Sequence, residues 1–258
     1  NIEIITKKGE NLEGEIYYYQ NLPNKIKDMF PILINYGTNF YQIEKIFGLT
    51  VTELFLSENL STKTLEHILN SLVRIQNVEL NFEQENNVDI YANYLKKIDF
   101  RYQNFDYSNF QNSEKVYLEL KESLSEYQKS KSGIKKLVHG DPVFTNILIN
   151  NYGKIKFIDM RGKLGEELSL FGDWLYDWAK VYQSLVGYDC ILQSKKISIC
   201  YQEMMINYFV NYFLQKYTEK DLQNLKIITK SLLFTLIPLH NNEKCIKYFN
   251  LINCSYLQ

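Results

Sequence analysis

The chain has 258 residues, of which 45% are hydrophobic, and this is enough to form one large domain or two unequal lobes. Its 29 basic and 30 acidic residues leave a net charge of −1 without an evident basic stripe, which argues against nucleic acid as a partner. We expect a cytoplasmic protein with reduced thiols and no membrane span, because no secretory signal opens the chain, no apolar run is long enough to cross a bilayer, and the four cysteines form no C-x-x-C pair.

The first 48 residues have the pattern of a small lobe with strands and one helix. Apolar alternation and turn residues predict these elements in chain order: strand 2–5, helix 12–22, strand 32–34 and strand 41–43. The last two flank a Gly-Thr-Asn turn at residues 37–39 and are expected to form a hairpin. The first strand leads into Lys7 and Lys8.

Beyond residue 48 the pattern is mainly helical. Behind a cap at Ser61 or Thr62, apolar residues recur at helical spacing on one face: Leu65, Ile68, Leu72 and Ile75. Further apolar stripes predict helices over residues 114–127, about 194–216 and about 220–236. We expect Pro238 to end the last of these, since proline cannot donate the backbone hydrogen bond of a helix.

The segment from His139 to Asn146 has the sequence H-G-D-P-V-F-T-N, and a strand-like pattern follows it. Two apolar runs, 146–150 and 154–158, are separated by an Asn-Tyr-Gly turn, which predicts a β-hairpin. The second run ends at Asp159, so the hairpin would bring Asp159 back beside Asn146.

These residue types suit one kind of chemistry. Moving a γ-phosphoryl group needs a base for the proton of the attacking hydroxyl, and oxygen ligands that hold Mg²⁺ against the triphosphate. Asp141 suits the first task, and Asn146 and Asp159 suit the second. A turn with Asp and Asn is often only a backbone-capping loop, but the loop, the hairpin and the terminal aspartate together predict a phosphoryl-transfer site.

A further segment, F-G-D-W-L-Y-D-W-A-K at residues 171–180, follows the hairpin. Together with the H-G-D-x-x-x-x-N loop and the apolar strand ending in Ile158 and Asp159, it resembles the aminoglycoside phosphotransferase and choline kinase-like family, small-molecule relatives of the protein kinases. The resemblance implies an α+β, two-lobed protein-kinase-like fold. Residues 1–48 would form a small antiparallel-sheet lobe that binds nucleotide, and residues 49–258 a helical lobe with the catalytic loop and the acceptor site.

The resemblance also implies roles for individual residues. Asp141 is expected to be the catalytic base, Asn146 and Asp159 are expected to bind Mg²⁺, and ATP or another nucleoside triphosphate would be the co-substrate. His139 is expected to stiffen the loop through a hydrogen bond to a carboxylate at the start of the following helix. Asp177 lies there and is expected to support the loop.

A lysine and a glutamate of the small lobe are candidates for phosphate binding. A lysine at the end of a strand can reach the α- and β-phosphates, and a glutamate on the next helix can orient it. Lys7 is slightly favoured over Lys8, and Glu15 over Glu13, although strand alternation alone does not choose between the lysines. The alternative is that these are solvated charges without a function.

Residues 42–48, Q-I-E-K-I-F-G, resemble the family's hinge, whose main-chain groups bind the adenine edge. Glu44, Lys45 and Ile46 are accordingly expected to line the base pocket. The family normally begins with two more strands, whose connecting loop covers the nucleotide phosphates, and nothing before Ile2 supplies them. We therefore expect either an excised part of a longer multidomain chain, or a kinase with a reduced lid and low affinity for ATP.

Arg161 departs from the family pattern, in which an acidic residue often lies two positions after the aspartate. Its guanidinium can bind a phosphate or carboxylate in a bidentate manner, so Arg161 and Lys163 are expected to favour an anionic or polyhydroxylated acceptor. The alternative is a salt bridge between Arg161 and one of three nearby carboxylates: Asp173, Glu166 or Glu167.

Four residues are expected to contact the acceptor: Arg161, Asp173, Tyr176 and His240. Aromatic side chains beside a site can stack on sugars or enclose an ammonium group. Tyr176, Trp174 and Trp178 equally suit the core face of a helix, and a helix cap is the alternative for His240.

The sequence therefore predicts a small-molecule kinase. It would transfer the γ-phosphoryl group of a nucleoside triphosphate to a hydroxyl of a sugar, amino sugar or amino alcohol, including acceptors that supply cell-surface polysaccharide. A catalytically silent kinase-like domain that binds a nucleotide or sugar for a partner domain is the alternative. The joint presence of Asp141, Asn146 and Asp159 argues against it.

Overall fold

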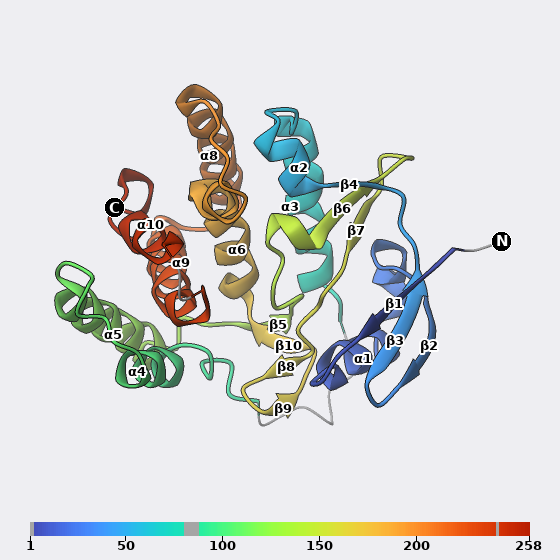
Figure 1. Ribbon diagram of the computed structural model, residues 1–258, viewed down its shortest axis with the longest axis horizontal. Helices are drawn as coiled ribbons and strands as arrows, with labels where there is room; N and C mark the ends of the chain where they lie inside the picture. Colours follow the sequence, from blue (N-terminus) through green and yellow to red (C-terminus); the bar gives the residue numbers. More distant parts are fainter. Residues whose placement is uncertain (1–2, 80–87, 241–242) are drawn as a thin grey trace.

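The computed structural model describes residues 3–79, 88–240 and 243–258 of the chain. It has the predicted α+β architecture, with a small antiparallel sheet on one side and a larger, mainly helical body on the other (Figure 1). A hairpin of strands β6 (Ile147–Asn150) and β7 (Ile155–Phe157) lies between these two parts (Figure 1). Both halves of the molecule therefore meet near the loop that precedes β6.

The small sheet has the strand order β1-β3-β2 with antiparallel pairing. Its strands are β1 (Ile4–Lys8), β2 (Leu33–Gly37) and β3 (Phe40–Glu44), and helix α1 (Glu13–Gln20) and the 3-10 helix η1 (Asn24–Met29) connect β1 to β2. Tyr41 is buried and lies opposite Lys7 in the register of β1 and β3. Because directly opposed side chains lie on the same face of a sheet, Lys7 points to the inner face and Lys8 away from it.

A second antiparallel sheet joins the N-terminal part to the hairpin, with β4 (Gly48–Thr50) pairing with β6 and β6 with β7. A capping box between Thr50 and Glu53 begins helix α2 (Val51–Leu56). Helix α3 (Thr62–Gln76) follows its cap residue Ser61, whose hydroxyl accepts a hydrogen bond from the amide of Thr64. Two short strand pairs are β5 (Lys135–Leu137) with β10 (Phe171–Asp173), and β8 (Lys163–Leu164) with β9 (Glu167–Leu168).

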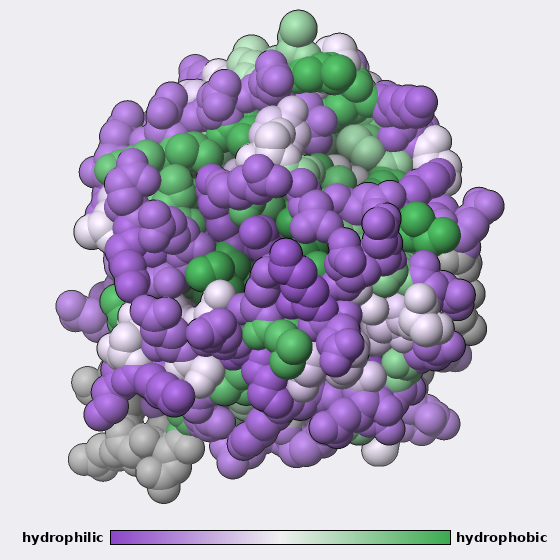
Figure 2. Space-filling view, turned by 90° about the vertical axis from the view of Figure 1, so that its left-hand side faces the viewer, coloured by the Kyte–Doolittle hydropathy of each residue, from purple (hydrophilic) through white to green (hydrophobic). Residues whose placement is uncertain are grey.

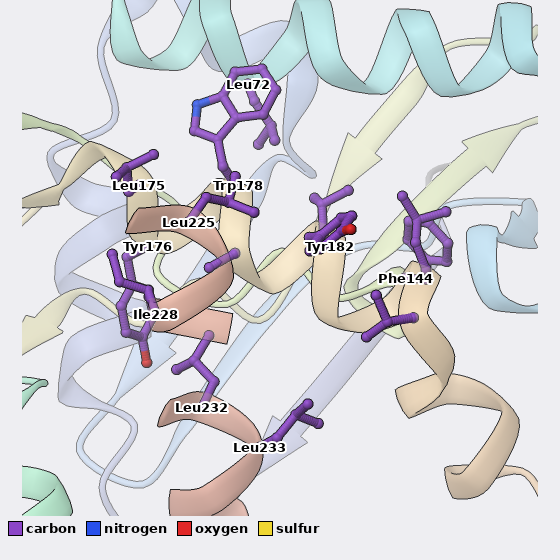
Figure 3. Close-up of a cluster of buried hydrophobic side chains, with 14 of the residues drawn as sticks. Leu72, Phe144, Leu175, Tyr176, Trp178, Tyr182, Leu225, Ile228, Leu232 and Leu233 are labelled. Atoms are coloured by element: carbon purple, nitrogen blue, oxygen red, sulfur yellow. The ribbon is translucent and has the colours of Figure 1, made fainter. Parts of the chain in front are cut away.

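The helical body is built around helix α6. Its helices are α4 (Leu95–Asn104), α5 (Ser113–Lys129), α6 (Trp174–Gln183), α7 (Asp189–Leu192), α8 (Ile199–Leu214), α9 (Glu219–His240) and α10 (Lys244–Leu251), with the short turns η2 (Phe144–Asn146), η3 (Ser184–Tyr188) and η4 (Ser255–Leu257). Figure 3 shows Trp178 of α6 beside Leu225 of α9 and Leu72 of α3. Trp178 is fully buried, and Trp174 is nearly so. Both tryptophans are therefore core residues and are not a stacking surface for an acceptor.

Helix α9 passes through Pro238 and ends at His240, which corrects the expectation that the proline ends it. A proline inside a helix leaves the carbonyl group four residues earlier without its usual donor. That carbonyl belongs to Phe234, and it accepts a hydrogen bond of 3.0 Å from the hydroxyl of Tyr107. Because the tyrosine replaces the missing amide, the helix continues for its final turn.

Hydrophilic residues cover most of the face shown in Figure 2, and hydrophobic residues occupy smaller areas between them. The largest fully buried side chains are aromatic, among them Trp178, Tyr18 and Phe144. Within the described residues, no helix is long and apolar enough to cross a membrane. The aromatic residues of this chain therefore mainly fill its core.

Helix α1 approaches the segment after β7 so closely that glycine is required on both sides of the contact. A Cβ atom on Gly14 would lie 2.3 Å from the carbonyl oxygen of Arg161. A Cβ atom on Gly162, which has a φ of +57°, would lie 1.8 Å from the carbonyl oxygen of Gly14. The backbones of the small lobe and of the segment after Asp159 are thus in direct contact.

We expect Gly14→Ala to destabilise the protein by about 1–3 kcal/mol, the usual cost of forcing extra atoms into a packed contact. This effect is opposite in sign to helix propensity, which favours alanine over glycine by about 1 kcal/mol inside a helix. Unfolding by urea measures the difference. Gly9→Ala is the matched control, because the atom nearest to the added Cβ would be 4.0 Å away. A Gly14→Ala variant as stable as wild type would contradict the close contact.

Candidate functional site

The backbone of the H-G-D loop is held by Asp177 of α6. The Asp177 carboxylate accepts hydrogen bonds from the amides of His139, at 2.7 Å, and Gly140, at 2.9 Å. Burial raises the pKa of Asp177 to about 7, although these two hydrogen bonds act in the opposite direction. Asp177 therefore contacts the loop as expected, but through backbone amides and not through the histidine ring.

The ring of His139 is a fully buried part of the loop's framework. Its Nδ1 accepts from the amide of Asp141 at 3.1 Å, so Nε2 carries the proton and donates to the carbonyl oxygen of Ile158 at 3.0 Å. Burial lowers the pKa of His139 to about 4, and the ring is neutral at pH 7. It links the loop to the end of β7, which is the architectural role that the sequence favours.

Asp141 faces Lys180 of helix α6, a residue to which the sequence analysis gives no role. The Lys180 ammonium lies 2.9 Å from Oδ1 of Asp141. Burial would raise the pKa of Asp141, but the attraction of Lys180 outweighs it and holds this pKa below its usual value. The carboxylate is therefore ionised at neutral pH and able to accept a proton. The i,i+3 spacing of Asp177 and Lys180 on one helix face was the available sequence signal.

The hairpin brings Asn146 and the end of β7 together, as predicted. Ile147 pairs with Phe157, and the amide of Ile158 donates to the carbonyl oxygen of Asn146 at 3.0 Å. The side-chain amide nitrogen of Asn146 donates to the backbone oxygen of Asp141 at 2.9 Å, and its carboxamide oxygen accepts from the hydroxyl of Thr145 at 3.4 Å. Asp159 follows with a φ of +57°.

Lys7 lies between two carboxylates. Its ammonium is 2.8 Å from Glu15 and 2.9 Å from Oδ1 of Asp159, and the Tyr41 hydroxyl also donates to Glu15. Burial lowers the pKa of Lys7, but the hydrogen bonds from its two carboxylate partners outweigh this, and the net pKa is raised. Lys7 and Glu15 are thus the lysine and glutamate that pair in the structure, whereas Glu13 pairs with Lys163 at 2.6 Å.

The donors at this point fit a hard divalent cation. Asn146 and Asp159 offer a carboxamide and a carboxylate oxygen, the ligand types that Mg²⁺ prefers. In the described part of the chain, no group of three or more His, Cys, Asp or Glu side chains could hold a metal ion. Such a pair of protein ligands still suits Mg²⁺, which usually takes one or two carboxylates and completes its shell with water and substrate phosphates.

The expected hinge residues lie on a pocket of about 590 Å³ between the end of β3 and the β6–β7 hairpin, and Glu44, Lys45 and Ile46 all line it. The amides of Glu44 and Lys45 already donate to the carbonyl oxygens of Ile32, at 3.0 Å, and Glu3, at 2.8 Å. Among the described residues, the amide of Ile46 has no such acceptor. The amide of Ile46 thus differs from those of Glu44 and Lys45 in having no such backbone partner within the described ranges.

Arg161 does not form the salt bridge that the sequence leaves open. Its Nη1 donates to the hydroxyl of Tyr176 at 3.2 Å, and no carboxylate in the described ranges pairs with it. Tyr176 is also close to Lys180, whose ammonium lies 5.8 Å from the centre of its ring. Arg161 and Tyr176 thus lie together, and both interact electrostatically with Asp141. Lys163 is instead bound to Glu13.

Asp173 occupies a structural position, which corrects its expected contact with the acceptor. It is 1% exposed and accepts hydrogen bonds from the hydroxyls of Tyr94, at 2.6 Å, and Tyr127, at 2.8 Å. The amide of Ile134 donates to it at 3.2 Å. Burial raises the pKa of Asp173 to about 6 despite these hydrogen bonds. Its acceptor capacity is used within the fold.

The structure does not bring His240 to the other expected acceptor residues. Its ring centre lies 4.9 Å from that of Tyr248 in helix α10. No described hydrogen bond or ion pair joins it to Asp141, Arg161 or Tyr176. A place at the end of α9 matches the alternative of a helix-terminal histidine.

We expect Asp177→Ala to lower the free energy of unfolding by about 2–4 kcal/mol, because it leaves two buried amides of the loop without an acceptor. Asp177→Asn retains one acceptor oxygen and should fall between this variant and wild type. Chemical denaturation monitored by tryptophan fluorescence gives both values. If Asp177→Ala were as stable as wild type, the loop would not depend on this carboxylate.

Comparisons with known proteins show the fold of the chain. No protein-family model and no curated protein matches it. Among solved structures, an ethanolamine kinase of Plasmodium vivax is 15% identical over 100% of this chain and 76% of its own, with a TM-score of 0.62. A choline/ethanolamine kinase family protein of Mesorhizobium loti is 14% identical over 99% of this chain and 85% of its own, with a TM-score of 0.65.

A thermostable aminoglycoside phosphotransferase mutant, in a ternary complex with ADP and hygromycin B, is 14% identical over 96% of this chain and 82% of its own, with a TM-score of 0.66. The chain therefore has the two-lobed, protein-kinase-like fold shared by choline and ethanolamine kinases and aminoglycoside phosphotransferases. At these identities the likeness concerns the fold, and the activity has to be argued from the site.

Proposed function

We propose that this chain is a phosphotransferase that moves the γ-phosphoryl group of ATP, or of another nucleoside triphosphate, to a hydroxyl of a small molecule. The observation that carries the proposal is the meeting of four polar groups, three from residues 141–159 and one from the N-terminal strand and helix, in one place. They are the ionised carboxylate of Asp141, the carboxamide of Asn146, the carboxylate of Asp159 and the Lys7–Glu15 ion pair.

Each group has a task in this reaction. The acceptor oxygen bonds to the γ-phosphorus while the bond from that phosphorus to the β,γ-bridging oxygen breaks, and the nucleoside diphosphate leaves. The hydroxyl proton passes to Asp141, which Lys180 keeps ionised. Lys7, oriented by Glu15, would contact the α- and β-phosphates. Asn146 and Asp159 would hold Mg²⁺, which neutralises charge on the phosphate oxygens when bound.

Several neighbours in fold bear on the nucleotide and on the acceptor. One is an aminoglycoside phosphotransferase in complex with ADP and hygromycin B, and another is in complex with AMP. Two further neighbours are an ethanolamine kinase and a choline kinase. We propose sugars, amino sugars and amino alcohols as the acceptors, including acceptors that supply cell-surface polysaccharide. The 1–48 and 49–258 division into a nucleotide lobe and an acceptor lobe is part of the same proposal.

A screen for release of nucleoside diphosphate tests this function. ATP and GTP are each incubated with a panel of sugars, amino sugars and amino alcohols, with and without Mg²⁺. A kinase gives diphosphate that depends on both the acceptor and the metal. Nucleotide binding without turnover of any acceptor would instead support a catalytically silent binding domain and would contradict the proposal.

A further inference from the structure

A pocket of about 620 Å³ opens beside the proposed catalytic residues, between helix α4 and the segment after Asp159. Lys97 and Arg101 of α4 line it, together with Arg161 from the other side. Lys97 and Arg101 are four residues apart and therefore share one face of the helix. Phe100, which is 58% exposed, and Leu164 add apolar surface. The pocket thus combines apolar surface with these three cationic side chains, and Lys96 is a fourth cation on its lining.

These three cations have no anionic partner within the described residues. Neither Lys97 nor Arg101 forms an ion pair or a side-chain hydrogen bond there, and Nε of Arg101 is buried without an acceptor. The side chain of Arg161 donates to the hydroxyl of Tyr176 and has no other side-chain hydrogen bond within residues 3–79, 88–240 and 243–258. A buried or half-buried cation without a partner is costly, so a protein usually pairs it.

The acidic residues on the pocket do not neutralise these cations. Asp89 pairs with Lys96 at 3.4 Å. Glu166 and Glu167 are exposed, and neither lies within ion-pair distance of Lys97, Arg101 or Arg161 in the described part of the chain, where Glu166 acts on Lys163. Among the described residues, the positive charges of Lys97, Arg101 and Arg161 are therefore not compensated by a direct ion pair.

The pKa values of Tyr176 and Lys97 are both lowered by the positive charges that surround them. Burial raises the pKa of Tyr176, but Lys97, Lys180 and Arg161 outweigh it and bring this pKa down to about 8. Tyr176 raises the pKa of Lys97, yet burial and the neighbouring cations Lys180, Arg161 and Arg101 outweigh that effect, and the net pKa is lowered. Arg161 of this pocket and Lys180 both lower the pKa of Asp141, and Lys180 is bound to it, so the pocket's cations lie near the proposed base.

We propose that this pocket binds an anionic group of the acceptor, a phosphate or a carboxylate, while a hydroxyl of the same molecule faces Asp141. The inference rests on the proposed function and narrows its substrate class to acidic, hydroxyl-bearing small molecules such as sugar phosphates or sugar acids. Guanidinium and ammonium groups form strong charge-assisted hydrogen bonds with both kinds of anion. The transfer itself is unchanged: the hydroxyl takes the γ-phosphoryl group, its proton goes to Asp141 and the nucleoside diphosphate leaves.

The test compares acceptors that share one skeleton and differ in charge: glucose, glucosamine, glucuronate and glucose 6-phosphate. Thermal unfolding of the full chain is recorded with each probe, and turnover is recorded with ATP and Mg²⁺. Lys97→Ala and Arg101→Ala are compared with Lys115→Ala, a control with the same charge change on helix α5, where Lys115 is 75% exposed. Nucleotide affinity is measured for all variants.

We expect the two acidic probes, and not the neutral or aminated ones, to raise the melting temperature of wild type and of Lys115→Ala. Lys97→Ala and Arg101→Ala should lose this shift and raise KM for an acidic acceptor roughly ten- to a hundredfold, the usual effect of losing one charge-assisted contact. Their nucleotide affinity should be unchanged. A preference for glucosamine, or an equal shift in the Lys97 variant, would overturn the anionic pocket.

Two further outcomes separate this inference from the proposed function. If the acidic probes bind in a Lys97-dependent manner and no acceptor is turned over, the anionic pocket is supported and the proposed kinase activity is contradicted. If Lys97→Ala weakens nucleotide binding and leaves the acceptor KM unchanged, the cations bind the terminal phosphate of the nucleotide, and the acceptor inference fails.

A stability measurement without ligand adds an independent readout. Lys97→Met keeps much of the side chain's apolar stem and removes one of several crowded charges. We expect it to melt at a higher temperature than wild type, because like charges that are kept together for a ligand repel one another when the ligand is absent. A lower melting temperature would show that Lys97 serves the fold and would contradict the inference.

Discussion

Asp141→Asn is expected to lower turnover by about 10²–10⁴-fold, the range usual for removing a general base. The carboxamide cannot accept the proton of the acceptor hydroxyl. Its size and its backbone are unchanged, so the amide of residue 141 still donates to His139, and the carbonyl still accepts from Asn146. We therefore expect the variant to fold normally and to bind nucleotide nearly as wild type does.

The pairing with Lys180 sharpens this prediction. In wild type the ammonium of Lys180 has the carboxylate of Asp141 as its ion-pair partner, at 2.9 Å. Asp141→Asn leaves that ammonium without a counter-charge, so some loss of stability is expected together with the loss of turnover. Circular dichroism and thermal unfolding would separate the two effects, because a modest drop in melting temperature leaves the protein folded at 25 °C.

Asp106→Asn is a suitable control, since Asp106 is exposed and hydrogen-bonds within its own turn to Ser108. Single-turnover kinetics with saturating nucleotide report the chemical step for both variants. Asp106→Asn should retain wild-type turnover. Wild-type turnover in Asp141→Asn would falsify the assignment of the base.

The sequence predicted the β6–β7 hairpin, and the approach of Asn146 to the end of β7, because that part of the candidate site is local. His139 to Asp159 is one continuous stretch, and a hairpin with a short turn has few possible registers. The pairing of Ile147 with Phe157 followed from the apolar pattern on the two arms. By contrast, the choice between Lys7 and Lys8 needed the partner strand, because only the pairing of Lys7 with buried Tyr41 shows which lysine faces inward.

The parts that the sequence missed depend on contacts between distant segments. Lys97 and Arg101 lie on a helix that the sequence analysis did not identify, and they meet Arg161 only because α4 packs beside the segment after β7. Their i,i+4 spacing is also that of an ordinary solvated helix face. The acidic motif residue Asp173 was misassigned for the same reason, since its tyrosine partners come from α5 and from the residue before α4.

A proline gave the clearest failure of a local rule. Pro238 has the usual property of a helix terminator, and the rule fails because Tyr107, more than a hundred residues earlier, supplies the missing donor. A pattern within the helix holds no information about that donor. Local rules in this chain thus fail where a tertiary hydrogen bond replaces a backbone one.

Asp159→Ala is expected to abolish the Mg²⁺-dependent part of nucleotide binding, and transfer with it. A carboxylate at this position would hold the metal that neutralises the phosphate oxygens, and alanine has no ligand atom to offer. The loss should not come from unfolding, since the ion pair between Asp159 and Lys7 is partly exposed, and such pairs contribute about 0–1 kcal/mol.

The backbone at residue 159 calls for a second variant. Asp159 has a φ of +57°, a conformation that aspartate and asparagine tolerate better than alanine does. Asp159→Asn keeps that tolerance and removes the charge, so an effect shared by both variants belongs to the carboxylate and not to the backbone. Calorimetric titration of each variant with nucleotide, with and without Mg²⁺, measures the metal-dependent affinity. Wild type should bind more tightly when Mg²⁺ is present, and Asp159→Ala should be indifferent to it. Asp159→Asn keeps a neutral carboxamide oxygen and should retain only part of this dependence. Equal Mg²⁺-dependent affinity in all three proteins would remove Asp159 from the metal site and leave its contact with Lys7 as its role.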